Sequence, residues 1–216
     1  MQRHSGKTIA IALSGIYHRI SFFQWAGKLG ADNLNSNHAS IIESTKDWLE
    51  KAVIGLNLCP FAKAVHVKNQ IRYVVSDAAT PEALLEDLLN ELHVLADSDA
   101  ELIDTTLLIH PSVLTDFLDY NDFLDVADAA ASEPEFGDQF QVASFHPQFQ
   151  FAGTGVDDIE NYTNRSPYPM LHLLREESVE RAVAAFPEAE QIYQKNMLTL
   201  RQLGHAGWLR LFAAGT

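Results

Sequence analysis

The alternation of apolar and polar positions becomes regular from residue 40 onward. Between residues 40 and 57, apolar side chains recur at the spacing of one helix face, which predicts an amphipathic helix. Residues 71–76 form a short apolar run that is typical of a buried strand. The polar residues 77–80, followed by Pro81, then predict the start of a helix that continues to about residue 96.

The remainder of the chain repeats this alternation of strands and helices. Two more apolar runs predict strands, at residues 105–110 and 139–145. Helical spacing predicts three more helices, at residues 112–131, 169–185 and 188–203. Gly204 and Gly207 are expected to end the last of them. Strands that alternate with helices require crossover connections, so we predict an α/β fold: a small, at least partly parallel sheet with helices packed on it, in a single domain.

The first 39 residues differ in composition from the rest. They carry four Lys or Arg against one acidic residue, and we interpret residues 1–39 as an N-terminal extension that is disordered or reflects a mis-assigned start. Residues 40–216 then form the single α/β domain. The sequence has one cysteine, which excludes an intrachain disulfide and agrees with a cytoplasmic location. No apolar stretch reaches the roughly 18–20 residues that cross a bilayer, so we expect no membrane association.

Charge is distributed unevenly along this acidic chain. The formal net charge is −14, which disfavours binding to nucleic acid. Between Arg72 and Arg165 the sequence has no Lys or Arg but 20 Asp and Glu. Arg165 and Arg175 therefore stand out as candidate binders of a small anionic molecule, since a guanidinium group presents a fixed fork of donors to carboxylate or phosphate.

Two histidines follow predicted strands in similar motifs. LLIHP places His110 at the end of the second strand, and ASFHP places His146 at the end of the third. If those strands are parallel, both side chains lie at the carboxyl edge of the sheet, where α/β proteins bind their ligands. We predict that His110 and His146 are general acid and base or metal ligands. The alternative is that each imidazole only caps its loop by hydrogen bonding to nearby backbone.

The segment from residue 144 to 175 carries the other candidate ligand-binding residues. Arg165 and Asn164 precede the helix predicted at 169–185, and His172 and Arg175 are expected on one face of that helix. A helix N-terminus adds unpaired N–H groups that favour an anion. The alternative is that Arg165 pairs with a neighbouring acid, Asp157, Asp158 or Glu160, and only holds the loop together.

Cys59 is a further candidate for chemistry, as a thiolate ligand or nucleophile. A buried thiol that packs as a small hydrophobic group is the alternative. A metal bound by His110 and His146 would need a third ligand, for which His172, Cys59 and Asp157 are the candidates. Their positions match no recognised ligand spacing, so neither the metal nor any cofactor is specified by the sequence.

Several longer phrases carry a family resemblance. LNLCPFAKAV, LLIHP, SFHPQFQFAGT and NYTNRSPYPMLHLLRE resemble the family called domain of unknown function 1415, over roughly residues 40–203. The resemblance implies a soluble bacterial protein and supplies no activity or catalytic residue. The residues themselves favour an enzyme that acts on a small anionic metabolite, with a non-catalytic metabolite-binding or regulatory module as the alternative. Oligomeric state is not determined by the sequence.

Overall fold

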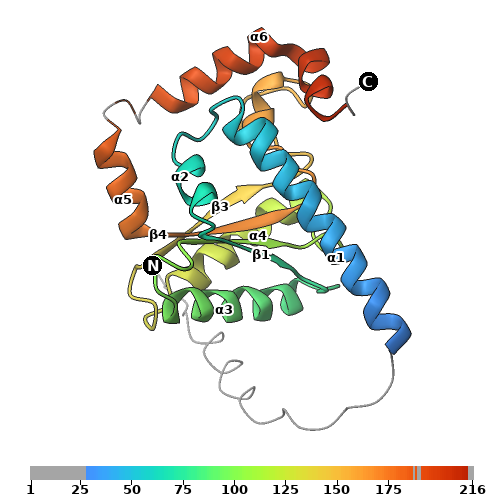
Figure 1. Ribbon diagram of the computed structural model, residues 1–216, viewed down its shortest axis with the longest axis vertical. Coiled ribbons are helices and arrows are strands. Elements are labelled where there is room, and N and C mark those ends of the chain that lie inside the picture. Colours follow the sequence, from blue (N-terminus) through green and yellow to red (C-terminus); the bar gives the residue numbers. More distant parts are fainter. Residues whose placement is uncertain (1–27, 187, 189–190, 214–216) are drawn as a thin grey trace, which may run out of the picture. The chain divides into compact units, whose positions relative to one another are not determined.

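The computed structural model describes residues 28–186, 188 and 191–213 (Figure 1). Most of the predicted N-terminal extension, residues 1–27, lies outside the described residues. The chain divides into two units at residue 36, and the second unit, residues 37–216, is described below. The first helix, α1 (Lys28–Trp48), begins in the first unit and ends in the second, so the predicted boundary at residue 39 falls within a helix.

A four-stranded mixed sheet is the centre of the second unit. Its strands are β1 (Ile71–Val75), β2 (Thr105–Ile109), β3 (Phe140–Phe145) and β4 (Met170–Arg175), and their order across the sheet is β1-β2-β4-β3. β1 and β2 are parallel, whereas β4 is antiparallel to both β2 and β3. It follows that β1, β2 and β3 run in the same direction, with β4 inserted between β2 and β3. The three predicted strands and the α/β class are confirmed.

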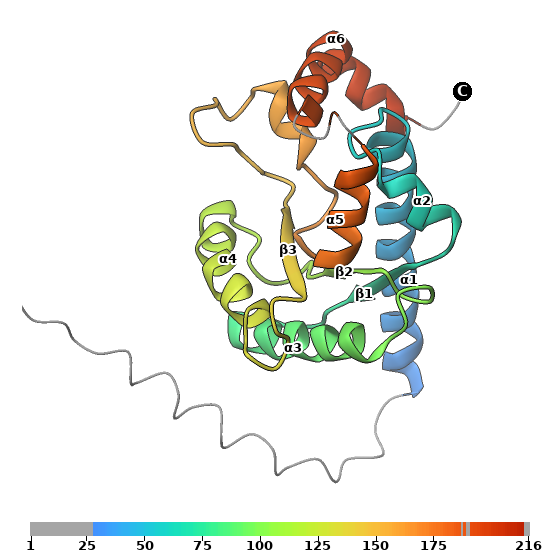
Figure 2. The ribbon, with the colours of Figure 1, turned by 90° about the vertical axis from the view of Figure 1, so that its left-hand side faces the viewer.

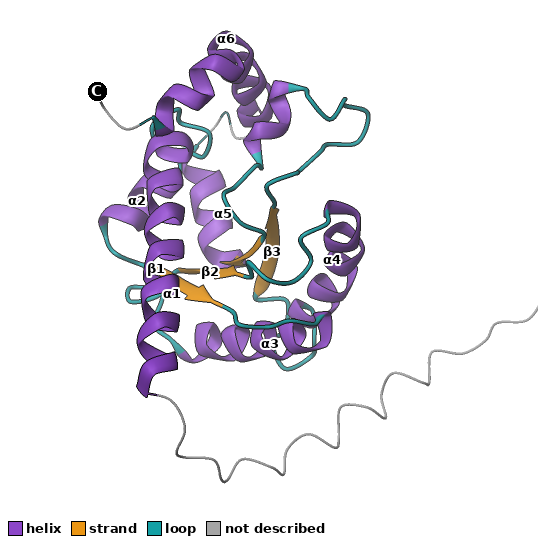
Figure 3. Cartoon of the chain, turned by 90° about the vertical axis from the view of Figure 1, so that its right-hand side faces the viewer, coloured by secondary structure: helices purple, strands orange, loops and turns teal. Residues whose placement is uncertain are grey.

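Helices cover both faces of this sheet. Those named in order after α1 are η2 (Leu49–Ile54), α2 (Ala62–Val67), α3 (Pro81–Asp97), α4 (Phe117–Ala131), η3 (Ile159–Thr163), α5 (Glu176–Ala185) and α6 (Ile192–Phe212). α3 and α4 pack on one face, while α2 and α5 lie on the other (Figures 2 and 3). Within the described part of the chain, no helix is both long and apolar enough to cross a membrane.

Local capping explains where α3 and α4 begin. Thr80 accepts a hydrogen bond from the Ala83 N–H, and Pro81 occupies the first turn of α3. Asp116 caps α4 in the same way, so this helix starts at Phe117 and the prediction of a start at residue 112 was five residues too early. Leu114 has a φ of 53°, which no helix accommodates, and this turn separates β2 from the cap.

The prediction of one helix over residues 169–185 was wrong in its first half. Residues 170–175 form β4, and only residues 176–185 are helical, as α5. A six-residue apolar run after a proline fits a strand as well as a helix, and here the backbone groups pair with two neighbouring strands. The C-terminal helix also differs from its prediction: Gly204, with a φ of 62°, interrupts the helical backbone, but α6 resumes and continues to Phe212.

Two hydrophobic cores lie on the opposite faces of the sheet. One packs α3 and α4 against β-strand residues such as Leu108, Leu171 and Leu173. The other packs Trp48, Ala52 and other residues of α1 and η2, together with part of α6, against the reverse face. The second core does not fill the whole face, and the candidate site lies beside it.

Candidate functional site

The candidate site is the central part of the sheet face that points away from α3 and α4. His172 lies in the middle of β4, directly between Leu107 of β2 and Ala143 of β3. Paired residues on neighbouring strands share a face, so these three side chains lie side by side. Their neighbours Leu171 and Leu173 point the other way, into the core beneath α3 and α4.

A cavity of about 740 Å³, which we call the chamber, lies over this face. Residues of all four strands form its floor: Ile71, Thr105, Leu107, Gln141, Ala143, Phe145, His172 and Leu174. Its walls come from η2, from the segment around α2 and from α5: Leu49, Val53, Cys59, Phe61, Val65, Val179, Ala182 and Phe186. The size and the apolar character of the lining are those of a pocket for a small organic molecule.

One wall of the chamber is a π-helix, a rare element that occurs often at functional sites. This element is η2, whose buried residues Leu49 and Val53 line the chamber. Gly55 follows it, and a Cβ at that position would lie 2.3 Å from the Lys51 carbonyl oxygen. The tight closure of η2 therefore requires glycine, because any side chain would force the wall to move.

His172 is the imidazole of the chamber. Its Nε2 lies 2.7 Å from the Thr105 hydroxyl oxygen, and that hydroxyl lies 2.6 Å from the Leu173 carbonyl oxygen. Burial lowers the pKa of His172 to about 4, so the ring is uncharged near neutral pH. The floor of the chamber thus holds a neutral imidazole, of which one nitrogen, Nε2, is hydrogen-bonded to Thr105.

Polar side chains gather at the end of the chamber near the starts of β1 and β2. The Ser178 hydroxyl donates to the Asp104 carboxylate at 2.5 Å, and Arg181 donates to Ser178 and to Glu177. Gln70 donates to the carbonyls of the turn before β2. Since acids and bases both occur at this end, it carries no strong field of one sign.

Cys59 lies in the chamber wall and is only partly buried. Burial raises the pKa of its thiol, although the neighbouring backbone N–H groups of Phe61 and Ala62 act in the opposite direction. A raised pKa keeps the sulfur protonated near pH 7, which makes it a poor nucleophile. The contacts therefore favour a thiol that contributes apolar surface to the chamber.

Comparison with known proteins identifies the family to which this chain belongs. The family model described as protein of unknown function (DUF1415) matches residues 40–210. The chain belongs to the DUF1415 family. No curated protein and no solved structure matches the chain.

In this DUF1415 domain, His110 and His146 lie at the same edge of the sheet, as predicted from their motifs. They follow β2 and β3, which run in the same direction with β4 between them. Both are fully buried on the α3–α4 face, and the ring of Tyr120 contacts each of them, at centroid distances of 5.8 and 5.0 Å. The chamber lies on the opposite face, so the sheet separates this pair from His172.

Backbone groups satisfy most nitrogens of the histidine pair. His146 Nε2 donates to the Leu114 carbonyl at 3.2 Å, and its Nδ1 accepts from the Gln148 N–H at 3.0 Å. His110 Nδ1 donates to the Val113 carbonyl at 3.0 Å, whereas its Nε2 is buried without a partner among the described residues. Burial lowers the pKa of His110 to about 4 and lowers that of His146 as well. These contacts are the loop-holding arrangement that the sequence offered as the alternative.

Arg165 and Asn164 hold the loop between β3 and β4 in place. The Arg165 guanidinium donates to the carbonyls of Phe149 and Val156 and lies over the Tyr162 ring at 4.6 Å. Asn164 donates to the Ser144 carbonyl. The expected partners of Arg165 in the loop-holding alternative were acidic side chains, but the observed ones are backbone oxygens. None of these residues lines the chamber.

Arg175 does not share a face with His172, contrary to the helical prediction. The two residues are three apart on a strand, so their side chains point to opposite sides of the sheet. The Arg175 guanidinium donates to the carbonyls of Leu95, Ser98 and Ile103. It therefore satisfies the C-terminal carbonyls of α3 and the turn that follows, and it lies away from the chamber.

A metal site does not emerge among the described residues. Within these ranges, no group of three His, Cys, Asp or Glu side chains is placed to hold a metal ion. Of the third ligands considered for His110 and His146, His172 lies across the sheet and Asp157 is exposed in the β3–β4 loop.

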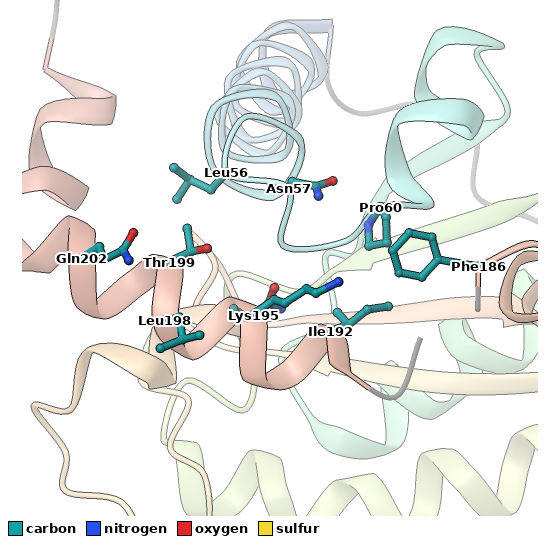
Figure 4. Close-up of a pocket in the computed structure, with 10 residues that line it drawn as sticks. Leu56, Asn57, Pro60, Phe186, Ile192, Lys195, Leu198, Thr199 and Gln202 are labelled. Atoms are coloured by element: carbon teal, nitrogen blue, oxygen red, sulfur yellow. The ribbon is translucent and has the colours of Figure 1, made fainter. Parts of the chain in front are cut away.

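A second, smaller cavity of about 410 Å³ adjoins the chamber (Figure 4). α6 contributes Lys195, Asn196 and Thr199 to it, among other residues. Pro60 and Phe186 line both cavities, and Figure 4 shows these two side chains next to each other. The chamber and the second cavity therefore share a wall, which consists of the side chains of Pro60 and Phe186.

The sequence analysis missed most residues of the chamber. Thr105 and Ala143 carry no distinctive motif, and the α5 residues were assigned to a helix without a binding role. The one available signal was His172 within the apolar run MLHLLR, since a strand there would place the histidine among apolar neighbours on one face.

Proposed function

We propose that this domain binds a small organic molecule with a mainly apolar body, and that the chamber is the binding site. The observation that carries the proposal is the chamber itself, a cavity of about 740 Å³ with walls from three separate segments and a floor of four strands. Pockets of this kind, mainly apolar with a few polar groups, are where proteins bind small ligands. The proposal keeps the binding module that the sequence offered as the alternative, but it places the site in the chamber and not in the Arg-containing loop.

Desolvation of apolar surface supplies the expected affinity. Apolar surface gains about 25 cal/mol per Å² on burial, so a ligand that buries about 250 Å² gains about 6 kcal/mol. The loss of translational and rotational freedom offsets part of that gain. A gain of 6 kcal/mol corresponds to a Kd of about 40 μM before that offset, so the expected Kd for a simple apolar probe lies between about 40 μM and roughly the millimolar range.

The contacts of the two arginines weigh against an anionic ligand in the chamber. Arg165 and Arg175 direct their donors to backbone carbonyls elsewhere. His172 is uncharged near neutral pH, and Asp104 and Glu101 line the polar end beside Lys68 and Arg181. Lys68 and Arg181 lie among as many acids there, so an anion would be desolvated without a surplus of positive charge, which is costly.

Titration with Nile red, an uncharged fluorescent probe, tests this proposal. Ala143→Trp places an indole on the chamber floor, and we expect it to weaken binding by about tenfold or more because it occupies the space of the probe. Val126→Trp adds the same ring on α4, where Val126 is 41% exposed, and is expected to leave binding unchanged. The absence of saturable binding to the wild type, or equal binding to both variants, would contradict the proposal.

A second candidate function retains the histidine pair as acid and base acting on a small anionic metabolite. One observation favours it: His110 Nε2 is a buried acceptor without a partner in the described part of the chain, which is uncommon. A thermal-shift screen of anionic metabolites tests it. Turnover of a stabilising anion that is lost in His146→Ala while binding persists would support this candidate, and the absence of any stabilising anion would contradict it. The single cysteine supports the cytoplasmic location in either case.

A further inference from the structure

The hydrogen bonds of Thr105 determine where the proton of His172 lies. Thr105 is buried, and its hydroxyl has a single hydrogen. Two oxygens 2.6 Å apart repel each other unless a hydrogen lies between them, so this hydrogen is donated to the Leu173 carbonyl. The Thr105 oxygen is then an acceptor toward His172, 2.7 Å away, and His172 Nε2 must be the donor.

The other ring nitrogen is consequently an acceptor. A neutral imidazole carries one N–H, and with that hydrogen on Nε2 the lone pair lies on Nδ1. Among the described residues, none donates to His172 Nδ1, and Nδ1 is not one of the buried polar atoms that lack a partner. The atom is therefore open to space, and the space that His172 borders is the chamber.

We propose that the chamber selects uncharged ligands that carry a hydroxyl or N–H group, and that His172 Nδ1 accepts the hydrogen bond from that group. This inference rests on the proposed function and specifies its ligand class: an apolar molecule with one hydrogen-bond donor placed to meet the middle of β4. A ligand without the donor leaves Nδ1 without a hydrogen bond once it displaces water from the floor.

The immediate surroundings of His172 favour an uncharged donor over an ammonium group. Leu107 and Ala143 lie on either side of it, and the ring of Phe145 lies 6.0 Å away. A cation held there would lose its hydration and gain only one neutral acceptor. The same apolar neighbours can contact the apolar body of a neutral ligand, which has no charge to desolvate.

A matched pair of probes tests the inference: 2-naphthol, which has a hydroxyl donor, and 2-methoxynaphthalene, which does not. Dissociation constants are measured for the wild type and for His172→Phe, which keeps a ring and removes both nitrogens. We expect the preference for the naphthol, expressed as the ratio of the two constants, to be about 3- to 10-fold larger in the wild type than in the variant. Equal preferences in the two proteins would overturn the inference.

Thr105→Val provides a second test if His172→Phe does not fold. Valine matches threonine in shape but accepts no hydrogen bond, so the proton of His172 is no longer held on Nε2 and the lone pair is no longer held on Nδ1. The naphthol preference should then fall below that of the wild type, and an undiminished preference would overturn the inference.

Binding of 2-methoxynaphthalene to the wild type distinguishes the failure of this inference from the failure of the proposed function. If it binds and no donor preference exists, only the donor inference fails; if neither probe binds the wild type, the proposed function fails.

Discussion

Lowering the pH from 7 to 5 is expected to destabilise this fold through its buried histidines. Burial lowers the pKa of His110 and of His172 to about 4, compared with about 6.5 for an exposed imidazole. Between these two values the unfolded chain binds more protons than the folded chain, so the free energy of unfolding falls as the pH falls. The stabilisation is fully present above about pH 6.5 and is lost as the pH approaches about 4.

The magnitude follows from the same two pKa values. A histidine whose pKa is about 6.5 unfolded and about 4 folded loses about 2 kcal/mol of stabilisation between pH 7 and pH 5. His110 and His172 together account for about 4 kcal/mol. His146, whose pKa is also lowered by burial, acts in the same direction. This is a large part of the roughly 5–15 kcal/mol that stabilises a typical domain.

Carboxylates do not add to this loss. Burial and the neighbouring Asp125 raise the pKa of Asp128, so the contribution of Asp128 to stability rises as the pH falls. The hydrogen bond from Arg201 lowers the pKa of Glu160, and that stabilisation is lost only at pH values below the ordinary range of a glutamate. The loss between pH 7 and pH 5 is therefore assigned to the histidines.

Urea titrations at pH 7, 6 and 5, followed by tryptophan fluorescence, measure the effect, since Trp48 and Trp208 are both buried. His172→Phe should remove about 2 kcal/mol of the pH dependence, whatever it does to stability at pH 7. His205→Gln is the control, because His205 is exposed on α6, and it should keep the wild-type dependence. A wild-type free energy of unfolding that is equal at pH 7 and pH 5, or a dependence that His172→Phe leaves unchanged, would refute the reasoning.

Three further outcomes are expected. Tyr120→Phe removes a buried hydroxyl that donates to β4 and accepts from β3, so it should lower the free energy of unfolding by about 2–4 kcal/mol in a urea titration. Tyr193→Phe, at an exposed position, is the control and should lower it by less than about 0.5 kcal/mol. Arg175→Met leaves three carbonyls, at the C-terminus of α3 and in the turn after it, without their donor, and should also cost about 2–4 kcal/mol. Arg210→Met, on the exposed side of α6, should be nearly neutral, and equal effects of the two substitutions would contradict the role assigned to Arg175. Cys59 should react with a thiol reagent at pH 7 more slowly than free cysteine, and more slowly still with Nile red bound; a rate that saturating probe does not change would place the probe outside the chamber.

The local elements were predictable because local physics determines them. The strands at β1, β2 and β3 follow from short apolar runs, and α3 begins where a threonine cap precedes a proline. β4 was not predictable in this way. The run MLHLLR is compatible with either a helix or a strand, and only the open hydrogen-bonding edges of β2 and β3 on either side select the strand.

Because residues 170–175 form a strand and not a helix, the candidate site moves from the sheet edge with His110 and His146 to the chamber around His172. The sequence alone placed His110 and His146 at the same edge of the sheet, because a strand direction and a following proline suffice for that inference. It did not determine that nearby backbone groups occupy three of their four ring nitrogens, since the turns after β2 and β3 depend on packing against Tyr120.

Composition and apolar pattern by themselves established an acidic α/β domain with one cysteine and without a membrane-spanning stretch. The chamber was decided only by tertiary structure. Its floor and walls come from residues that are far apart in the chain, and most of them are ordinary apolar side chains that a buried core would use equally well. Whether such residues enclose a filled core or a cavity depends on how closely η2, α2 and α5 approach the sheet, which is a property of the packed fold and of no local segment.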